Sequence, residues 1–256
     1  MKYNFIRIFF ALLIVSMFAV KFFFPFSWLW FLLIIFIYSL FLVFGAIKIQ
    51  ANFFINSINN AQTQEKKIAI TFDDGPIENN TNIVLDILKK NNVQAAFFCI
   101  GNRIEKQPEL LKRIHEENHI IGNHSYSHHF FFDLKSAQEM QIELSKTDLI
   151  IEQIIGKKAK FFRPPYGVTN PNLAKAIKSK NYHSIGWSVR SMDTVVKTEQ
   201  KLLSNITHNL KSGDIVLLHD SAKITIENLQ KIIDAIKQNG FEIVRLDKLL
   251  KIEPYA

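Results

Sequence analysis

The chain divides into an apolar N-terminal stretch and a longer part in which short apolar runs alternate with amphipathic segments. Residues 5–47 are almost wholly apolar and are interrupted by Arg7, by Lys21 and by the Pro25-Phe26-Ser27 break. From residue 66 onward the apolar runs are short and bounded by polar residues or glycine, as buried strands tend to be. The pattern therefore predicts a membrane segment followed by one α/β domain.

The apolar stretch, residues 1–49, predicts two membrane-spanning helices, at about residues 5–20 and 28–47. The second has the twenty or so uncharged residues that are needed to cross a bilayer. The first is shorter, and Arg7 lies near its end, where its side chain can reach the lipid headgroups. Trp28 and Trp30 suit a membrane interface beside the break. One long anchor is the alternative, and so is a cleaved signal peptide, although no small-residue cleavage site follows the first helix.

The charge pattern leaves the side of the membrane undecided. Two crossings put both flanks on one side, and the basic residues of the flanks outnumber Lys21 in the turn: Lys2, Arg7, Lys48, Lys66 and Lys67. The positive-inside rule then indicates a cytoplasmic domain, whereas a single crossing reverses the answer.

The net charge of +8 comes in large part from the N-terminal segment. Residues 1–64 contain four basic residues and no acidic one, which leaves 27 basic and 23 acidic residues in the remainder. A balance so close to neutral, without a stripe of aromatic and basic residues, argues against a nucleic-acid partner. Residues 50–65, rich in Asn and Gln, are expected to be a linker. We see no sign of an obligate protein partner.

The remainder of the chain predicts seven strands, at residues 68–72, 94–100, 120–123, 160–163, 182–187, 215–218 and 242–245. Helical patterns separate them, at residues 81–91, 108–117, 137–155, 172–180, 199–210 and 226–239. Such alternation implies crossover connections and a mostly parallel sheet. Seven units of this kind approach a closed barrel, for which eight would be usual.

Polar residues follow several of these strands at their carboxyl ends, where ligands gather in α/β folds. Asp73 and Asp74 end the first strand, His124 ends the third, Arg163 ends the fourth and His219 ends the sixth. Four separated pieces of sequence are therefore expected to converge on one rim of the sheet.

Asp74, His124 and His128 are our candidate metal ligands, because a carboxylate and two imidazoles leave positions free for catalysis. The spacing of the histidines lets both reach one ion if the segment makes a helical turn. His129 is a rival for His128. The alternatives are an exposed polar loop at the histidines and an ordinary turn at Asp73-Asp74-Gly75-Pro76.

Residues 66–250 resemble the NodB-homology domain of the polysaccharide deacetylases, carbohydrate esterase family four, and we assign residues 66–256 to this domain. All five family motifs have counterparts in order: Thr71-Phe72-Asp73-Asp74-Gly75, His124-Ser125-Tyr126-Ser127-His128, Arg163-Pro164-Pro165-Tyr166, the Asp193 region and Leu217-Leu218-His219. The resemblance implies a distorted barrel of seven β/α units and hydrolysis of N-acetyl, or sometimes O-acetyl, groups on a polysaccharide.

The resemblance also implies a role for each motif residue. Asp73 would be the general base, oriented by Arg163. Asp74, His124 and His128 would hold a divalent metal ion, most often Zn²⁺, with Co²⁺ or another divalent ion as alternatives. His219 would be the general acid, aided by Asp193. The N–H of Tyr166 would help to bind the oxyanion, and Pro165, Tyr166 and Leu217 would contact the substrate.

One motif departs from the family pattern. Many members have Asp-x-x-Asp-Trp where this chain has Arg190-Ser191-Met192-Asp193-Thr194. Arg190 and Thr194 thus replace an aspartate and a tryptophan of the sugar groove. Arg190 has two interpretations, contact with an anionic group of the substrate or a structural ion pair. Trp187 is expected in the core.

The sequence predicts a membrane-anchored, metal-dependent deacetylase acting on an N-acetylated polysaccharide or amino-sugar glycan. The alternatives are a catalytically silent, carbohydrate-binding or scaffolding relative, and an O-acetyl esterase acting on a glycan or a lipid-linked sugar. The lipid bilayer is the second predicted partner, through the N-terminal segment. The family favours an extracytoplasmic catalytic domain, against the cytoplasmic side that the charge bias indicates.

Overall fold

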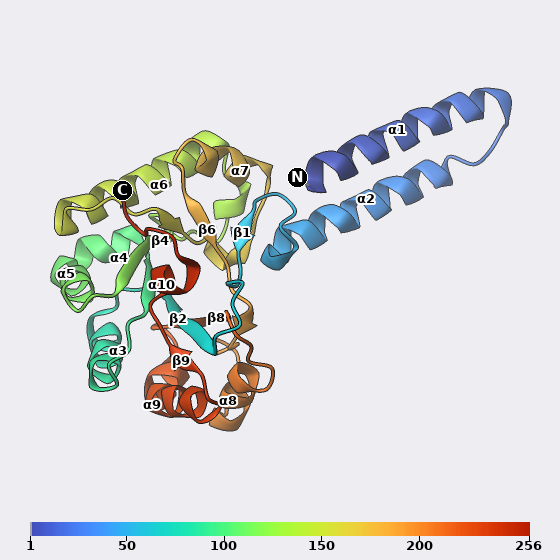
Figure 1. Cartoon of the computed structure of the whole chain (residues 1–256). Helices are drawn as coiled ribbons and strands as arrows, with labels where there is room; N and C mark the ends of the chain where they lie inside the picture. Colours follow the sequence, from blue (N-terminus) through green and yellow to red (C-terminus); the bar gives the residue numbers. More distant parts are fainter. Residues whose placement is uncertain (1) are drawn as a thin grey trace.

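A computed structural model describes residues 2–256. Two apolar helices, α1 (Lys2–Phe23) and α2 (Leu29–Ile47), form a hairpin that projects from one side of the α/β domain (Figure 1). Both are long and apolar enough to cross a membrane. Helix α1 continues past Lys21 to Phe23. The ammonium group of Lys21 donates to the carbonyl of Phe26 and lies 4.5 Å from the centre of the Trp28 ring. The helices are separated at the Pro25 break, as predicted.

The segment expected to be a linker, residues 50–65, is packed against the domain. A short 3-10 helix, Ile49–Ala51, begins just before it, and the segment contains the strand β1 (Ser57–Ile58), which pairs with β6 (His183–Ile185) at one edge of the sheet. Phe53, Phe54 and Ile55 are only 4–6% exposed. The linker prediction was wrong because it rested on the Asn- and Gln-rich composition. Within this segment an apolar run, residues 53–55, is buried against the domain.

All seven predicted strands are present in one parallel sheet. They are β2 (Lys67–Asp73), β3 (Ala96–Cys99), β4 (Ile120–Asn123), β5 (Phe161–Phe162), β6 (His183–Ile185), β8 (Ile215–His219) and β9 (Glu242–Ile243). Two two-residue strands, β1 and β7 (Val189–Arg190), were not predicted. The order is β1-β6-β5-β4-β3-β2-β8-β7, with β9 beside the start of β2. The predicted NodB-like barrel is therefore a curled, open sheet, with β1 and β7 at its edges among the described residues.

Helices cover the outside of this sheet (Figure 1). They are α3 (Glu78–Lys90), α4 (Gly101–Lys106), α5 (Pro108–Glu116), α6 (Ala137–Ile155), α7 (Pro171–Lys178), α8 (Glu199–Thr207) and α9 (Lys223–Gln238). Helix α10 (Leu246–Leu250) instead buries Leu246 and Leu249 in the cluster that contains Ala69 and Phe98, on the inner side of the sheet. The bounds predicted for α6 are confirmed, since a capping box between Ser136 and Glu139 starts it and Gly156, at φ +68°, ends it. The short α4 and α10 were not predicted.

Strand β2 shows how the core positions the site. Ile68, Ile70 and Phe72 belong to the apolar cluster that also contains residues of α3 and α9. Successive side chains of a strand point to opposite faces, so Thr71 and Asp73 share the inner face with Ala69. This alternation sends the Asp73 carboxylate into the interior of the curled sheet, where the buried Arg163 side chain meets it.

Candidate active site

A cavity of about 280 Å³ lies at the carboxyl ends of the central strands. It brings together residues from every predicted motif, and its lining consists of Asp73, Asp74, His124, His128, Tyr166, Gly167, Trp187, Arg190, Thr194, Leu217 and His219. The strand ends therefore converge on one rim.

Asp74, His124 and His128 offer ligand atoms that all lie within 4.8 Å of one another. Nε2 of His128 is 3.5 Å and Nε2 of His124 is 3.8 Å from the same Asp74 oxygen. The histidine segment is not the helical turn that we expected. It is a loop with positive φ at Ser125 (63°) and His128 (47°), so both imidazoles reach Asp74 by a different backbone path.

The protonation states of these side chains suit a divalent metal ion. Nδ1 of His124 is 2.8 Å from the carbonyl oxygen of Arg163, so it donates its proton there and leaves Nε2 with a free lone pair. Burial, together with the charge of His124, lowers the pKa of His128 to about 4. The histidines lower the pKa of Asp74 although burial opposes this shift. Two imidazoles and one carboxylate are a donor set that fits Zn²⁺.

The rival ligand, His129, does not join this group. Its side chain is exposed, and its Nδ1 accepts a hydrogen bond from the backbone N–H of Phe131. His128 and not His129 therefore completes the cluster with Asp74 and His124.

Glu143 of α6 holds the loop that carries His128. Its carboxylate accepts hydrogen bonds from the backbone N–H and the hydroxyl of Ser127 and from the N–H of Tyr126, and it pairs with Lys135. Because Glu143 is buried, these bonds are shielded from water and fix the loop firmly.

Asp73 is held by the fully buried Arg163. The guanidinium group donates to Asp73 Oδ1 at 2.6 Å and to the hydroxyl of Thr71 at 2.8 Å. Its Nε and Nη2 donate to the carbonyls of Ile185 and Gly186, so each of its three nitrogens makes a hydrogen bond. The second Asp73 oxygen is 3.8 Å from Nε2 of His124. Asp73 is thereby oriented with one oxygen toward the cluster.

His219 lies opposite Asp73, since the two residues are register partners in the parallel pair β2–β8. Asp193 accepts hydrogen bonds from His219 Nδ1 at 2.8 Å and from its backbone N–H at 2.7 Å. Burial disfavours the charged imidazole, but the bond to Asp193 and the nearby carboxylates raise the pKa of His219 to about 9. His219 is therefore protonated at pH 7, with Nε2 as the nitrogen available to a substrate.

Tyr166, Trp187 and Leu217 complete the wall of the cavity. Tyr166 has φ +58°, and its ring packs against His128 at 4.5 Å between centroids. Gly167 has φ +69°, and a Cβ there would lie 2.3 Å from the Trp187 ring, so only glycine fits. Pro165, also expected at the substrate, is buried and is not among the residues that line this cavity.

Comparison with known proteins identifies the family. The family described as polysaccharide deacetylase matches residues 60–185. The peptidoglycan-N-acetylmuramic acid deacetylase PdaA of Bacillus subtilis is 35% identical over 192 residues, which are 73% of this chain and 73% of PdaA. The chain belongs to the polysaccharide deacetylase family.

Solved structures of polysaccharide deacetylases share this fold. A crystal structure of a peptidoglycan N-acetylglucosamine deacetylase has a TM-score of 0.73 at 32% identity, over 77% of this chain and 94% of that one. A pseudoenzyme of the same esterase family from Bacillus anthracis has a TM-score of 0.69 at 27% identity, over 76% of this chain and 68% of that one. The relatives named as peptidoglycan deacetylases are hydrolases that remove N-acetyl groups, and the family is metal-dependent.

Arg190 stands where the family motif has an aspartate, which reverses the charge at this position. No carboxylate of residues 2–256 lies within 4.0 Å of its side chain, so the interpretation as a structural ion pair has no support. Its guanidinium carbon is 6.0 Å from the centre of the Trp187 ring. Trp187 is buried, as expected, but it also lines the cavity.

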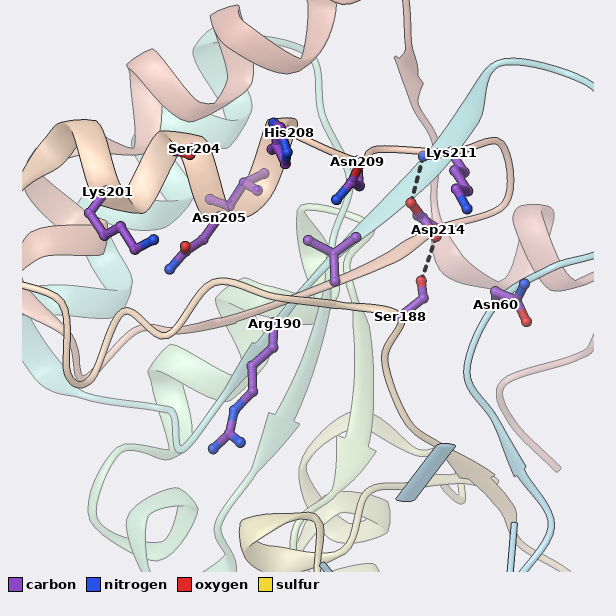
Figure 2. Close-up of a pocket in the computed structure, with 12 residues that line it drawn as sticks. Asn60, Ser188, Arg190, Lys201, Ser204, Asn205, His208, Asn209, Lys211 and Asp214 are labelled. Carbon is purple, nitrogen blue, oxygen red and sulfur yellow. Dashed lines mark hydrogen bonds between the residues drawn. The ribbon is translucent and has the colours of Figure 1, made fainter. Parts of the chain in front are cut away.

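A second, larger cavity of about 780 Å³ runs along β7 and α8. Figure 2 shows that the Arg190 side chain points away from the polar residues on the α8 side of this cavity, such as Lys201 and His208. Asp214 there is already bonded to the Ser188 hydroxyl and the Lys211 N–H. Arg190 lines both cavities.

Several supporting residues were missed by the sequence reasoning. Arg103 donates to the backbone carbonyl of Asp74 at 2.7 Å. Asp220 is fully buried beside Gly75 and accepts a hydrogen bond from the Thr81 hydroxyl. Burial raises the pKa of Asp220 to about 7, with the charge of Asp74 adding to the shift. The sequence feature that could have pointed to Asp220 is its position, directly after His219 at the end of a strand.

Proposed function

We propose that this chain is a membrane-anchored, Zn²⁺-dependent deacetylase that hydrolyses N-acetyl groups of peptidoglycan amino sugars. The observation that carries the proposal is the joint lining of one cavity by the Asp74–His124–His128 cluster, the Arg163-bound Asp73 and the Asp193-bound His219. Relatives named for N-acetylglucosamine and for N-acetylmuramic acid support the substrate class.

Asp74, His124 and His128 would hold the metal ion, which supplies a Lewis acid that makes water nucleophilic near neutral pH. Asp73 takes the proton of the attacking water, and the hydrogen bond from Arg163 holds its carboxylate in place. The backbone N–H of Tyr166, which has no acceptor among the described residues, is a donor for the developing oxyanion. The products are acetate and the free amine of the sugar.

His219 delivers a proton to the leaving nitrogen, which an amine needs because it departs poorly as an anion. Asp193 keeps the imidazole charged and fixes Nδ1, so that Nε2 faces the substrate. Asp73 and His219 are register partners on the neighbouring strands β2 and β8, so base and acid line the same cavity.

The hairpin of α1 and α2 would anchor the enzyme in the bilayer. Only about a tenth or less of either apolar window is buried, so most of this surface needs an apolar environment. We favour an extracytoplasmic catalytic domain because peptidoglycan lies outside the membrane, against the weak charge bias of the flanks.

The test is acetate release by the full chain from a panel of N-acetylated glycans, with Asp73→Asn as the control. We expect the substitution to lower kcat by at least a hundredfold, as removal of a general base does. Equal acetate release by the variant would refute the assigned base. No release by either protein would favour the silent, carbohydrate-binding alternative, for which the pseudoenzyme neighbour is a precedent.

A further inference from the structure

The hairpin ends at the rim of the catalytic cavity and not on the opposite side of the domain. The Thr169 N–H donates to the carbonyl of Ala46 at 3.0 Å, and its hydroxyl donates to that of Gly45 at 3.2 Å. Both carbonyls belong to the last turn of α2. Thr169 follows Tyr166 by three residues, so the loop that lines the cavity is bonded directly to a proposed membrane span.

The wall of the cavity also rests on the residues that follow α2. Ile49 packs with Trp187 and Leu217 in one buried cluster, and both of these residues line the cavity. The Gln50 side chain donates to the carbonyl of Trp187 at 2.8 Å. The catalytic cavity is therefore separated from the end of α2 by a single layer of side chains.

Lysines mark the expected level of the lipid headgroups at this end of the hairpin. Lys48 is exposed and directly follows α2, and Lys2 at the start of α1 donates to the carbonyl of Ala51. Gly45 and Ala46 precede Lys48 by three and two residues, about 3–5 Å along the helix axis. The Thr169 loop thus touches the hairpin at the depth of the interface.

A second loop at the rim of the cavity, residues 130–134, exposes large apolar side chains. Phe130, Phe131 and Leu134 are 72%, 53% and 74% exposed. Phe132 between them is buried in the cluster that contains Phe53 and residues near both ends of the hairpin. Asp133 in this loop is half-buried, and its carbonyl accepts a hydrogen bond from the side chain of Asn170, next to Thr169. We call residues 130–134 the rim loop.

An apolar cavity of about 490 Å³ lies at the base of the hairpin, close to the headgroup lysines. Its lining includes Phe5, Ile6, Phe41, Phe44 and Phe53. A cavity of this size and chemistry suits a segment of a lipid chain.

We propose that the catalytic rim lies on the bilayer, with the rim loop inserted in the membrane interface beside the hairpin, and that the substrate is an N-acetylated glycan carried on a membrane lipid. This inference rests on the proposed function, because it takes the hairpin to span the membrane and the site to deacetylate. Exposed aromatic and leucine side chains next to a span gain free energy by entering the interface. A lipid-linked sugar would meet the cavity there without leaving the bilayer.

Membrane contact is tested first, without reference to activity. Phe131→Cys in the full chain carries an environment-sensitive fluorophore, and the protein is reconstituted in phosphatidylcholine–phosphatidylglycerol vesicles with nitroxide-labelled lipids. Ile83→Cys on α3 is the matched control, since Ile83 is exposed and α3 lies far from the hairpin (Figure 1). The parent chain is the unlabelled control, because its one cysteine, Cys99, is buried. We expect lipid quenching at position 131 and none at position 83; equal quenching would overturn the proposal.

Substrate choice is tested with one N-acetylated disaccharide in lipid-linked and lipid-free forms. We expect at least a tenfold higher kcat/KM for the lipid-linked form in vesicles. The double variant Phe131→Ser, Leu134→Ser is expected to lose that preference and keep its rate on the free disaccharide, whereas Ile83→Ser keeps both. Equal kcat/KM for the two forms would overturn the lipid-linked substrate. Acetate from neither form would overturn the deacetylase assignment itself, while the quenching result would still decide membrane contact.

Discussion

At the scale of single residues, Asp193 controls when His219 carries its proton. The carboxylate accepts two hydrogen bonds from His219, and with the nearby carboxylates it raises the pKa of the imidazole to about 9 although burial opposes the shift. A general acid works only while protonated, so its contribution is complete well below pH 9 and is lost as the pH rises through this value. The pH profile of the enzyme therefore reports on this pair.

Asp193→Asn removes the charge and keeps the shape of the side chain. We expect the alkaline limb of kcat/KM for acetate release to move to lower pH by about 1–3 units, because the imidazole loses its anionic partner. The measurement is a pH–rate profile of both proteins. A limb at the same pH in both would show that another group sets it.

Arg190 is the residue most able to choose between glycans. It is exposed in the cavity, without a carboxylate partner in the described part of the chain. We expect Arg190→Gln to lower kcat/KM about tenfold for an acidic N-acetylated glycan and to leave a neutral one unchanged. Lys201→Gln, in the neighbouring cavity of Figure 2, is the control and should change neither rate. An equal loss on both glycans would assign Arg190 a structural role.

At the scale of elements, helix α6 supports the loop that carries the proposed metal ligand His128. Glu143 bonds the backbone of the loop that ends in His128. We expect Glu143→Gln to weaken Zn²⁺ binding about 10–100-fold, as loss of an outer-shell partner does. The measurement is a competition titration with a chelator. Glu139→Gln on the same helix is the control, since glutamine also serves in a capping box. Equal affinities for all three proteins would remove Glu143 from this role.

The segment between the hairpin and β2 is a structural part of the domain. Ser57 and Ile58 pair with β6, and the Ala61 N–H bonds to the carbonyl of Gly213. A fragment that starts at residue 66 exposes an unpaired strand edge and the apolar surface that residues 53–55 cover. We expect this fragment to unfold at a clearly lower temperature than a fragment that starts at residue 44. Equal melting temperatures in thermal scans would mean that residues 50–65 add no stability.

At the scale of the whole molecule, the features predicted from the sequence are those that short-range patterns determine, namely the seven strands and helix α6. Buried parallel strands are short apolar runs, so the sequence alone predicted that their ends place polar residues at one rim. The structure confirms this for Asp74, His124 and His219, which line the cavity, and places Arg163 behind it, bonded to Asp73. Helix α6 was predicted to the residue from its helical pattern, and the structure shows local capping residues at both of its ends. The mostly parallel sheet followed from the alternation of these elements, and the NodB-like fold from the resemblance of the five motifs.

What the sequence did not predict depends on contacts between distant segments. β1 and β7 have two residues each, so only their neighbours make them strands. The histidine loop is not helical because Glu143, far along the chain, bonds its backbone. The packing of residues 50–65, and with it the position of the hairpin at the catalytic rim, depends on Thr169 and Trp187. No local pattern carries that information.

The central claim is that Asp74, His124 and His128 hold one divalent metal ion. The most direct measurement is the metal content of the purified full chain, determined by mass spectrometry together with that of His128→Ala and His129→Ala. We predict one Zn²⁺ per chain in the parent and in His129→Ala, and none in His128→Ala. Equal metal content in all three proteins, or loss in His129→Ala alone, would contradict the assignment of the site.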